Sequence, residues 1–520
     1  MKKLLYSTIA IVAAGLLSSG CNSLNLAPED YYGSDSFWNN ASQVETFSLG
    51  LHKQIRDKYN MFFVLGECRG GTFRFGTSSQ NVSPNYEAPI KTNTFTASST
   101  GVSDWFGLYS NILQVNHFIE KVSKECKFLS DAERNYYLGE AYGIRALYYF
   151  VLYRTYGGVP LELEVRVMNG AANASDLYLE RSSAENTLKQ IKTDITNSET
   201  AFGSSTQIKS KYIWSPYATQ MLKAQVYLWS AKVATDDHKP GGKADFDVAE
   251  KALNTIISSK KFKLMDDFKT VFTNKVNDEV IFSIYFNKTE ATNIGSQFLC
   301  NPGDLLAFCS AEENGPFFTV DPLNIVTTGI HRHEYSPGFV RSFDSQDKRR
   351  AATFFEYYAN GTLPGALMLK YMGNYYASEN VRAYDSDVIV FRYADALLMM
   401  AEVQNGLGQD PSNYINQIRK RAFGNESHKY TNGTFAENEL AILKERDFEF
   451  VGEGTRWWDL VRMQDANKKS LVFSSAAAYK HELNETPKAI LSESDAYMIL
   501  WPIDVTVLND DKLIKQNPQY

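Results

Sequence analysis

The chain has 520 residues, of which 13% are aromatic, and its formal net charge is −7. This length allows one large body or several domains, while the acidic balance, without a basic cluster, argues against a nucleic-acid partner. The five cysteines lack the CxxC or Cys/His spacing of zinc sites, so a zinc-bound fold is not expected.

The N-terminal residues predict an export signal followed by a lipid anchor. Lys2 and Lys3 precede an apolar run that is too short to span a bilayer, and small residues follow it. Cys21 comes directly after these small residues, so that LLSSGC resembles a bacterial lipobox. We therefore expect removal of residues 1–20, palmitate or a similar acyl chain on Cys21, and a mature chain tethered to a membrane. Ordinary cleavage, with Cys21 incidental, is the alternative.

Apolar residues recur at spacings of three and four through the first half of the chain, which predicts a series of amphipathic helices. Ser130 with Glu133 has the capping-box pattern, and Gly157-Gly158 ends the helix that Ser130 begins. The predicted helices follow residue 35, span 108–122, begin at Ser130, at Ser182 and at Ser215-Pro216, and span 245–258.

The helical rhythm fails between about 259 and 386. Residues 279–286, EVIFSIYF, predict a strand, and the surrounding stretches rich in Gly, Pro and Asn predict long loops, where binding sites usually lie. Cys300 and Cys309 are close enough in sequence to form a disulfide in an exported protein. Buried thiols are the alternative for them, and equally for Cys68 and Cys126.

Helical patterns resume at residues 387–408 and continue with a helix from Asp410-Pro411 and another over 437–450. Small residues in the first of these, such as Ala394 and Ala401, are typical of tetratricopeptide-like helix pairs. The predicted fold is mainly α: a helical scaffold over 34–258 and 387–463, with a loop-rich subdomain at about 259–386 that contains a few short strands.

The segment ERDFEFVGEGTRWWDLVR, residues 445–462, raises the question of catalysis. Its glutamates at 445, 449 and 453 lie about 6 Å apart along one helix face, and paired carboxylates roughly 5–10 Å apart are also the machinery of glycosidases. The structural alternative pairs these glutamates with Arg446, Arg456 and Arg462 while the aromatic residues Phe448, Phe450, Trp457 and Trp458 pack inward. We favour the structural role, because buried charges need partners and this segment supplies both signs.

The chain resembles the RagB/SusD family in five segments that follow the family's order: EAYGIRALYYFVLYRTYGGVPLE (140–162), FRYADALLMMAEVQNGLG (391–408), INQIRKRAFG (415–424), ERDFEFVGEGTRWWDLVR (445–462) and MILWPIDVTVLNDDKLIKQNPQY (498–520). The resemblance covers the whole mature chain and implies one SusD-like unit over 21–520. It implies a lipid-anchored protein on the outer leaflet of the outer membrane, facing the cell exterior. It also implies a partner, a SusC-like TonB-dependent transporter, and non-catalytic binding of oligosaccharide.

Sugar rings are bound by aromatic stacking and by side chains that pair with hydroxyls. The candidate contacts are Glu67, Arg69, Arg74, Asn81 and Tyr86 in a glycine-rich stretch, Asp104, Trp105 and Phe106 at a helix start, and Phe317, Phe318, Tyr335 and Arg341 in the loop-rich part. The alternative for each aromatic residue is core packing, and for each arginine a surface ion pair.

The sequence leaves the glycan open. Arg69 and Arg74 favour an acidic host glycan such as a sialylated mucin chain, because arginine binds carboxylates well; a starch-like or plant glycan is the alternative. A glycoside hydrolase and a helical-repeat scaffold without glycan affinity are the competing functions. No cofactor is expected: His331 and His333 lack a third metal ligand, although loop carbonyls and scattered aspartates leave room for a structural Ca²⁺.

Overall fold

The computed structural model of the protein describes residues 37–75, 78–79, 88–102, 105–167, 173–310, 318–326, 329–359 and 363–520. The predicted signal and the lipidation site Cys21 lie outside these residues. In the part of the chain that is described, no helix has the combination of length and apolar character needed to cross a membrane.

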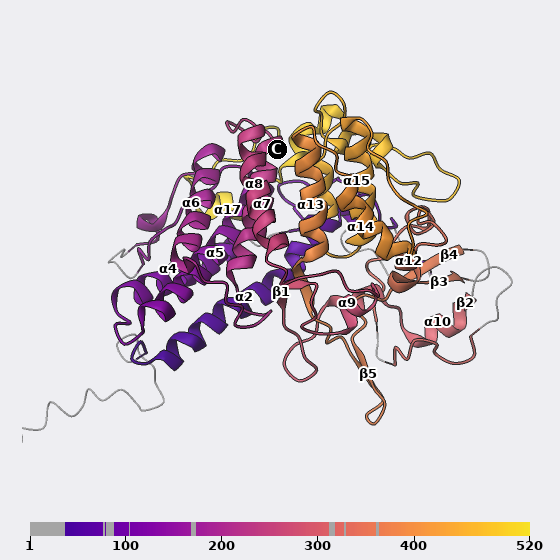
Figure 1. Ribbon diagram of the computed structural model, residues 1–520, viewed down its shortest axis with the longest axis horizontal. Coiled ribbons are helices and arrows are strands. Elements are labelled where there is room, and N and C mark those ends of the chain that lie inside the picture. Colours follow the sequence, from indigo (N-terminus) through magenta and orange to yellow (C-terminus); the bar gives the residue numbers. More distant parts are fainter. Residues whose placement is uncertain are drawn as a thin grey trace, which may run out of the picture.

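Long amphipathic helices build the N-terminal half (Figure 1). They are α2 (Ala41–Glu67), α4 (Trp105–Lys124), α5 (Asp131–Tyr156), α6 (Ala184–Phe202), α7 (Pro216–Lys232) and α8 (Lys243–Ser258). Helix α5 packs on α6 and α7 packs on α8, so that helices consecutive in sequence form pairs. The predicted tetratricopeptide-like pairing is therefore observed.

Helix ends follow the capping chemistry of the sequence. The predicted capping box of Ser130 and Glu133 is confirmed, and Gly157 ends α5 with a positive φ of 78° that favours glycine. Ser215 caps α7, with Pro216 at its first position. The predicted start at Ser182 is wrong by one residue, because Ser183 is the residue whose side chain accepts a backbone N–H of α6.

The C-terminal half adds α13 (Tyr393–Gly406), α14 (Ser412–Phe423), α15 (Phe435–Glu449) and the short α16 (Arg456–Arg462). The prediction that helix resumes at residue 387 is wrong for its first residues. Val388–Arg392 form strand β7, which pairs antiparallel with β1 (Val280–Ile284). Its run of branched and aromatic side chains suits a buried strand, and the helix begins only at Tyr393.

The middle of the chain is irregular, as expected, with short helices and two small sheets besides the β1–β7 pair. The short helices are α3 (Ala88–Lys91), α9 (Thr270–Thr273), α10 (Pro302–Phe308), α11 (Pro337–Val340), α12 (Lys348–Thr353) and α17 (Val505–Asp510), the first and last of them outside the middle itself. One sheet contains β2 (Cys309–Ser310), β3 (Phe354–Ala359) and β4 (Leu363–Met368), and the hairpin β5 (Asn374–Tyr376) and β6 (Val381–Ala383) projects from the body in Figure 1.

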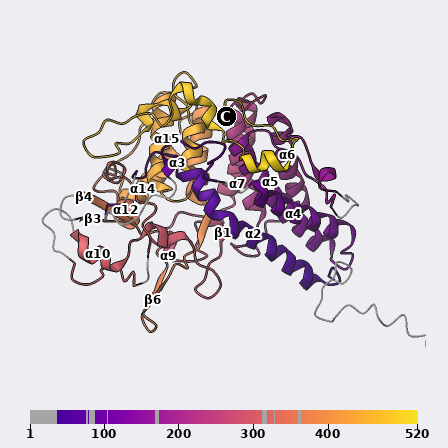
Figure 2. The ribbon, with the colours of Figure 1, turned by 180° about the vertical axis from the view of Figure 1, so that it is seen from behind.

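The two helical groups share one large core. Helix α13 packs against α8 across the middle of the molecule, and α16 packs against α2. The C-terminal segment then returns to the N-terminal helices (Figure 2), where Trp501 donates its backbone N–H to the Thr155 carbonyl (2.7 Å). This contact joins the C-terminal segment to the end of α5.

A buried carboxyl in the N-terminal core gives the stability of the fold a pH dependence. Glu140 on α5 is 1% exposed, accepts a hydrogen bond from Ser48 Oγ (2.6 Å), and lies 3.8 Å from Lys209 Nζ. Burial raises the pKa of Glu140 to about 7. The folded chain therefore holds this proton more tightly than the unfolded chain, so the stabilisation is present in acid and is lost as the pH rises through about 7.

Replacing Glu140 with glutamine removes this titration while keeping the shape of the side chain. Between pH 4.5 and 8, we expect the free energy of unfolding of the wild type, measured with urea, to fall by about 3 kcal/mol more than that of the variant. This difference comes from Glu140 alone. The same slope of stability with pH in both proteins would contradict the assignment.

Candidate functional site

An exposed pair of stacked rings marks one surface of the loop-rich side. Phe75 is 43% exposed, and its ring lies nearly parallel to the His481 imidazole, with centroids 4.0 Å apart and planes 15° apart. The Phe75 N–H donates to His481 Nε2 (3.2 Å), so this nitrogen carries no proton. Burial lowers the pKa of His481, which agrees with a neutral ring. The pair presents an aromatic face to solvent.

Arg74, the residue before Phe75, connects the segments that carry the two rings. Its guanidinium pairs with Glu482 (3.0 Å) and Glu334 (3.3 Å) and donates to the Pro364 carbonyl (2.6 Å). Arg74 is only 8% exposed, and these bonds connect it to three segments that are distant in sequence. These bonds fix Arg74, and with it the neighbouring Phe75, before a ligand binds. This reduces the entropy that is lost on binding.

A groove of about 510 Å³ lies between α11, α15 and the segment 476–487, and Lys480, the residue before His481, is part of its lining. This volume is in the range of small-ligand sites. Its apolar lining includes Leu440, Leu443, Tyr479, Leu483 and Pro487, and its basic lining residues are Arg341, Lys444 and Lys480.

The charges in the groove are mainly positive. Lys444 and Lys480 are exposed and form no ion pair within the described chain, whereas Arg341 pairs with Glu356 (2.9 Å). Asp447, the carboxylate among the described lining residues, is bound by Arg456 Nη1 (2.5 Å) and by the Tyr479 hydroxyl (2.8 Å). The described lining of the groove therefore offers cations to a ligand.

Three of the predicted contacts lie in the interior and hold the fold. Glu67 accepts hydrogen bonds from the Tyr335 hydroxyl (2.9 Å) and from the N–H groups of Gly452 and Gly454 (3.1 Å each). Arg69, which has no exposed surface, lies between aromatic rings and donates to the Met498 carbonyl (2.6 Å). A surface ligand cannot reach Glu67, Arg69 or Tyr335 in this conformation.

The remaining predicted contacts are spread over the molecule. Trp105 is buried and packs edge-on against Tyr156, while its neighbour Phe106 is 47% exposed on α4, far from α15 in both Figure 1 and Figure 2. Phe318 packs against Phe355 of β3. Asn81, Tyr86, Asp104 and Phe317 lie outside the described residues. Among the predicted residues that the structure describes, only Arg74 and Arg341 lie at the ring stack and its groove.

The predicted disulfide stays a prediction. Cys300 is buried, whereas the side chain of Cys309 lies outside what the structure describes, although its backbone pairs with Ala359 in the small sheet. The histidines of the middle segment are also buried: His333 packs among phenylalanine rings and contacts Gln297 (3.1 Å). No group of three acidic, histidine or cysteine side chains placed to hold a metal occurs among the described residues.

The glutamates of residues 445–462 form a buried ion network, and they do not line the groove. Glu449 is fully buried and is bound by Arg392 (2.5 Å), Arg349 (3.1 Å) and Arg421. Burial alone would raise the pKa of Glu449, but the three arginines hold this pKa well below its usual value. A general acid needs a raised pKa, so the predicted structural role of the segment fits its chemistry.

The partners predicted for these glutamates are wrong. Glu445 pairs with Arg349 and Arg419, and Glu453 with Lys370 and Arg392. Arg446, Arg456 and Arg462 bind aspartates and Glu402 instead. Neighbouring residues on a helix point in different directions, and the turn between α15 and α16 redirects the two later arginines. The predicted inward packing of Phe448, Phe450, Trp457 and Trp458 is confirmed.

Sequence reasoning missed four residues of the ring stack and its groove: Phe75, His481, Lys444 and Lys480. Phe73 and Phe75 are the same residue type two positions apart, yet Phe73 is 1% exposed because it pairs with Tyr335 in the interior. His481 lies about four hundred residues away from Phe75. No local pattern distinguishes the buried ring from the exposed one, and only the fold brings the second ring to it.

Known proteins resemble this chain over nearly all of its length. A sequence model described as SusD family matches residues 356–520, and one described as starch-binding associating with outer membrane matches residues 67–228. A crystal structure of a SusD superfamily protein from Bacteroides fragilis is 36% identical, with 93% of this chain and 100% of that chain covered and a TM-score of 0.83.

Two further relatives have a lower sequence identity, but their matches also cover most of both chains. The SusD-like protein P38 of Formosa agariphila is 27% identical and covers 100% of this chain and 99% of its own. The starch-binding protein SusD of Bacteroides thetaiotaomicron is 24% identical over 84% of this chain and 82% of its own length.

Proposed function

This chain belongs to the SusD family, and we propose that it is a lipid-anchored glycan-binding protein of the outer membrane that passes oligosaccharide to a SusC-like TonB-dependent transporter. The observation that carries the proposal is the exposed Phe75–His481 stack beside a groove of about 510 Å³. An aromatic face binds the apolar side of a sugar ring, and the nearby groove can accommodate the next sugar residue of the glycan. The similarity to a starch-binding relative and to a family described as associating with the outer membrane supports the same function.

We propose binding without catalysis. The acidic side chains of residues 445–453 are each paired with a lysine or an arginine. Among the described lining residues of the groove, Asp447 is the one carboxylate. Incubating the purified protein with the glycan it binds should therefore release no reducing ends. Turnover of any bound oligosaccharide would overturn this part of the proposal.

An acidic glycan, such as a mucin chain ending in sialic acid, is the ligand class that we favour. Lys444 and Lys480 provide cations without carboxylate partners, and a sugar carboxylate would supply the missing charge. Arg69 does not contribute, because it is buried. A neutral, starch-like glycan is the second candidate, favoured by the starch-binding description of the family matched at residues 67–228. A glycan array probed with the purified protein distinguishes the two: preference for sialylated over neutral chains supports the first, and the reverse supports the second.

Phe75 offers a direct test of the binding surface. Replacing it with alanine removes the exposed stacking face, and we expect the affinity for the bound oligosaccharide to fall about tenfold or more, as measured by calorimetry. The matched control is Phe106→Ala, which removes an equally exposed aromatic ring on α4. That variant should bind as tightly as the wild type. Unchanged binding in Phe75→Ala together with a loss in Phe106→Ala would move the site to α4.

A further inference from the structure

The backbone that leads to Phe75 is fixed by the segment before α11. Arg74 donates its N–H to the Glu334 carbonyl (2.8 Å), and the bridge one residue earlier is antiparallel. Successive N–H groups of an extended chain point to opposite sides, so that of Phe75 points away from Glu334. It donates to His481 Nε2 (3.2 Å) instead. The side chain of His481 therefore holds the backbone of Phe75 where the pairing with the other segment ends.

The backbone of His481 is fixed as well, so its ring is the part that can move. Gly338 of α11 donates its N–H to the His481 carbonyl (3.4 Å). A Cβ built at Gly338 would lie 1.9 Å from the Lys480 carbonyl oxygen, so the two backbones approach closely. Rotation about the side-chain bonds of His481 leaves these contacts unchanged. The contact between its imidazole and Phe75 can therefore form or break without unfolding the segment.

The charged groups near His481 determine how readily its ring takes up a proton. They are Arg74, Glu334, Glu482 and Glu485, together with Lys480, the preceding residue, while α11 itself has no charged side chain. Arg74 opposes protonation, and two of the carboxylates are already paired with it. Glu485, which accepts the N–H of residue 482 (3.3 Å), favours protonation. Burial outweighs Glu485 and, together with Arg74, lowers the pKa of His481 below its ordinary value.

We infer that the neutral His481 ring holds Phe75 in the orientation that binds glycan, and that a proton on Nε2 releases it. This inference rests on the proposed function, because it concerns the same aromatic surface. It makes His481 a positioning residue, whose effect on the ligand acts through Phe75.

Protonation from solvent breaks the contact because both ring nitrogens of an imidazolium are donors. Two N–H groups would then face each other across the 3.2 Å contact, and the hydrogen bond is lost. An imidazolium is attracted to an aromatic ring, but Arg74 repels it and Glu485 attracts it toward a carboxylate acceptor. The ring therefore turns from Phe75 toward Glu485.

The direction of the pH effect follows from which form binds. Because the neutral form binds glycan, the affinity is highest well above the pKa of His481 and falls as the pH drops through it. This pKa lies below the ordinary value of about 6.5. Binding should therefore be constant near neutral pH and weaken in mildly acidic solution, by at most about tenfold per pH unit for one proton.

Binding of sialyllactose and of maltoheptaose, a neutral probe, is measured by calorimetry at pH 7.5 and 5.0. We expect the wild type to bind its preferred probe about threefold or more weakly at pH 5.0. His481→Gln keeps an acceptor near the position of Nε2 but does not titrate, so its affinity should be equal at both pH values. His481→Phe keeps a ring without the acceptor, and it should bind more weakly than the wild type at pH 7.5, again without the pH dependence. An equal fall in all three proteins would refute the inference.

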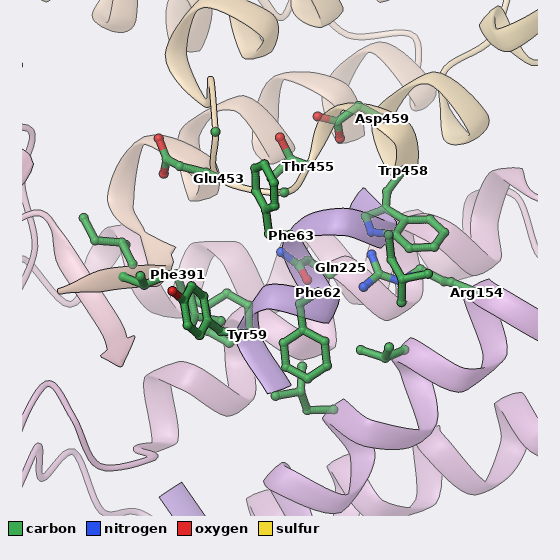
Figure 3. Close-up of a pocket in the computed structure, with 18 of the residues that line it drawn as sticks. Tyr59, Phe62, Phe63, Arg154, Gln225, Phe391, Glu453, Thr455, Trp458 and Asp459 are labelled. Carbon is green, nitrogen blue, oxygen red and sulfur yellow. The ribbon is translucent and has the colours of Figure 1, made fainter. Parts of the chain in front are cut away.

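Other titratable groups must be separated from His481. Burial raises the pKa of Glu67 and of Glu140 to about 7. Figure 3 shows Asp459 and Glu453 beside the apolar pocket between α5, α7 and α16, where each is paired with two basic side chains. All these groups are the same in the wild type and in both variants. A difference in pH dependence between the proteins therefore reports His481.

NMR of the protein labelled with ¹⁵N-histidine gives a readout that needs no glycan, and the seven histidines keep the spectrum simple. The signals that are absent from His481→Gln identify His481. At pH 7.5 its Nε2 should have the shift of an unprotonated nitrogen, and its titration midpoint should lie below about 6.5. A proton on Nε2 at pH 7.5, or a higher midpoint, would overturn the inference. Correct NMR behaviour without binding of either probe at pH 7.5 would instead contradict the proposed function, and the positioning of a glycan contact with it.

Discussion

Replacing Glu449 with glutamine is expected to lower the free energy of unfolding by about 3–5 kcal/mol. The side chain is fully buried and contacts three arginines that arrive from α12, β7 and α14. Glutamine keeps the shape but removes the charge, which leaves three guanidinium groups with one counter-charge too few in a region that excludes water. Chemical unfolding followed by circular dichroism measures the loss.

The matched control for this variant is Glu426→Gln. Glu426 is also paired with two cations, Lys420 (3.2 Å) and Lys429 (2.7 Å), but about half of its side chain is exposed. Solvent screens such pairs, so we expect the free energy of unfolding to stay close to that of the wild type. Similar losses in the two variants would show that burial does not control the strength of this network.

The long helices could be predicted from the sequence because their signals are local. The capping box at Ser130, the proline at Pro216 and the glycine at Gly157 act within one turn of the helix end, and the structure places helix ends at all three. Periodic apolar residues then fix which face is buried. These features require no knowledge of what packs against the helix.

The strand β7 shows where local pattern fails. Residues 388–392 read as the start of a helix because the helical sequence follows without a break, and no glycine or proline separates the two. Their strand conformation is set by β1, which lies more than a hundred residues earlier in the chain. Strand pairing of this kind depends on tertiary contacts, which periodicity does not report.

The candidate site could be predicted only in part, and for the same reason. Arg74 and Arg341 were identifiable as polar side chains in loop-rich segments, but exposure decides function, and exposure comes from the fold. Arg69 belongs to the same glycine-rich stretch as Arg74 and is enclosed by Trp457 and Trp501. The aromatic partner of Phe75 comes from residue 481. Sequence proximity therefore grouped residues that the fold separates.

The second large effect concerns Gly66, near the end of α2. A Cβ built at Gly66 would lie 1.8 Å from the Gly454 carbonyl oxygen and 2.8 Å from Trp458 Nε1. The first of these atoms belongs to the backbone of the turn between α15 and α16, where Gly452 and Gly454 both have positive φ. This turn cannot shift freely, because Glu67 accepts its two N–H groups. We expect Gly66→Ala to cost about 3 kcal/mol or more, by forcing α2 away from the turn.

Helix α2 contains its own control for this prediction. Gly50 lies in the same helix, and a Cβ there would meet nothing within 4 Å. Gly50→Ala should therefore stabilise the protein by about 0.5–1 kcal/mol, because alanine favours the helix. Opposite shifts of Tm in the two variants would show that the close approach of α2 to the turn, and not helix propensity, limits position 66.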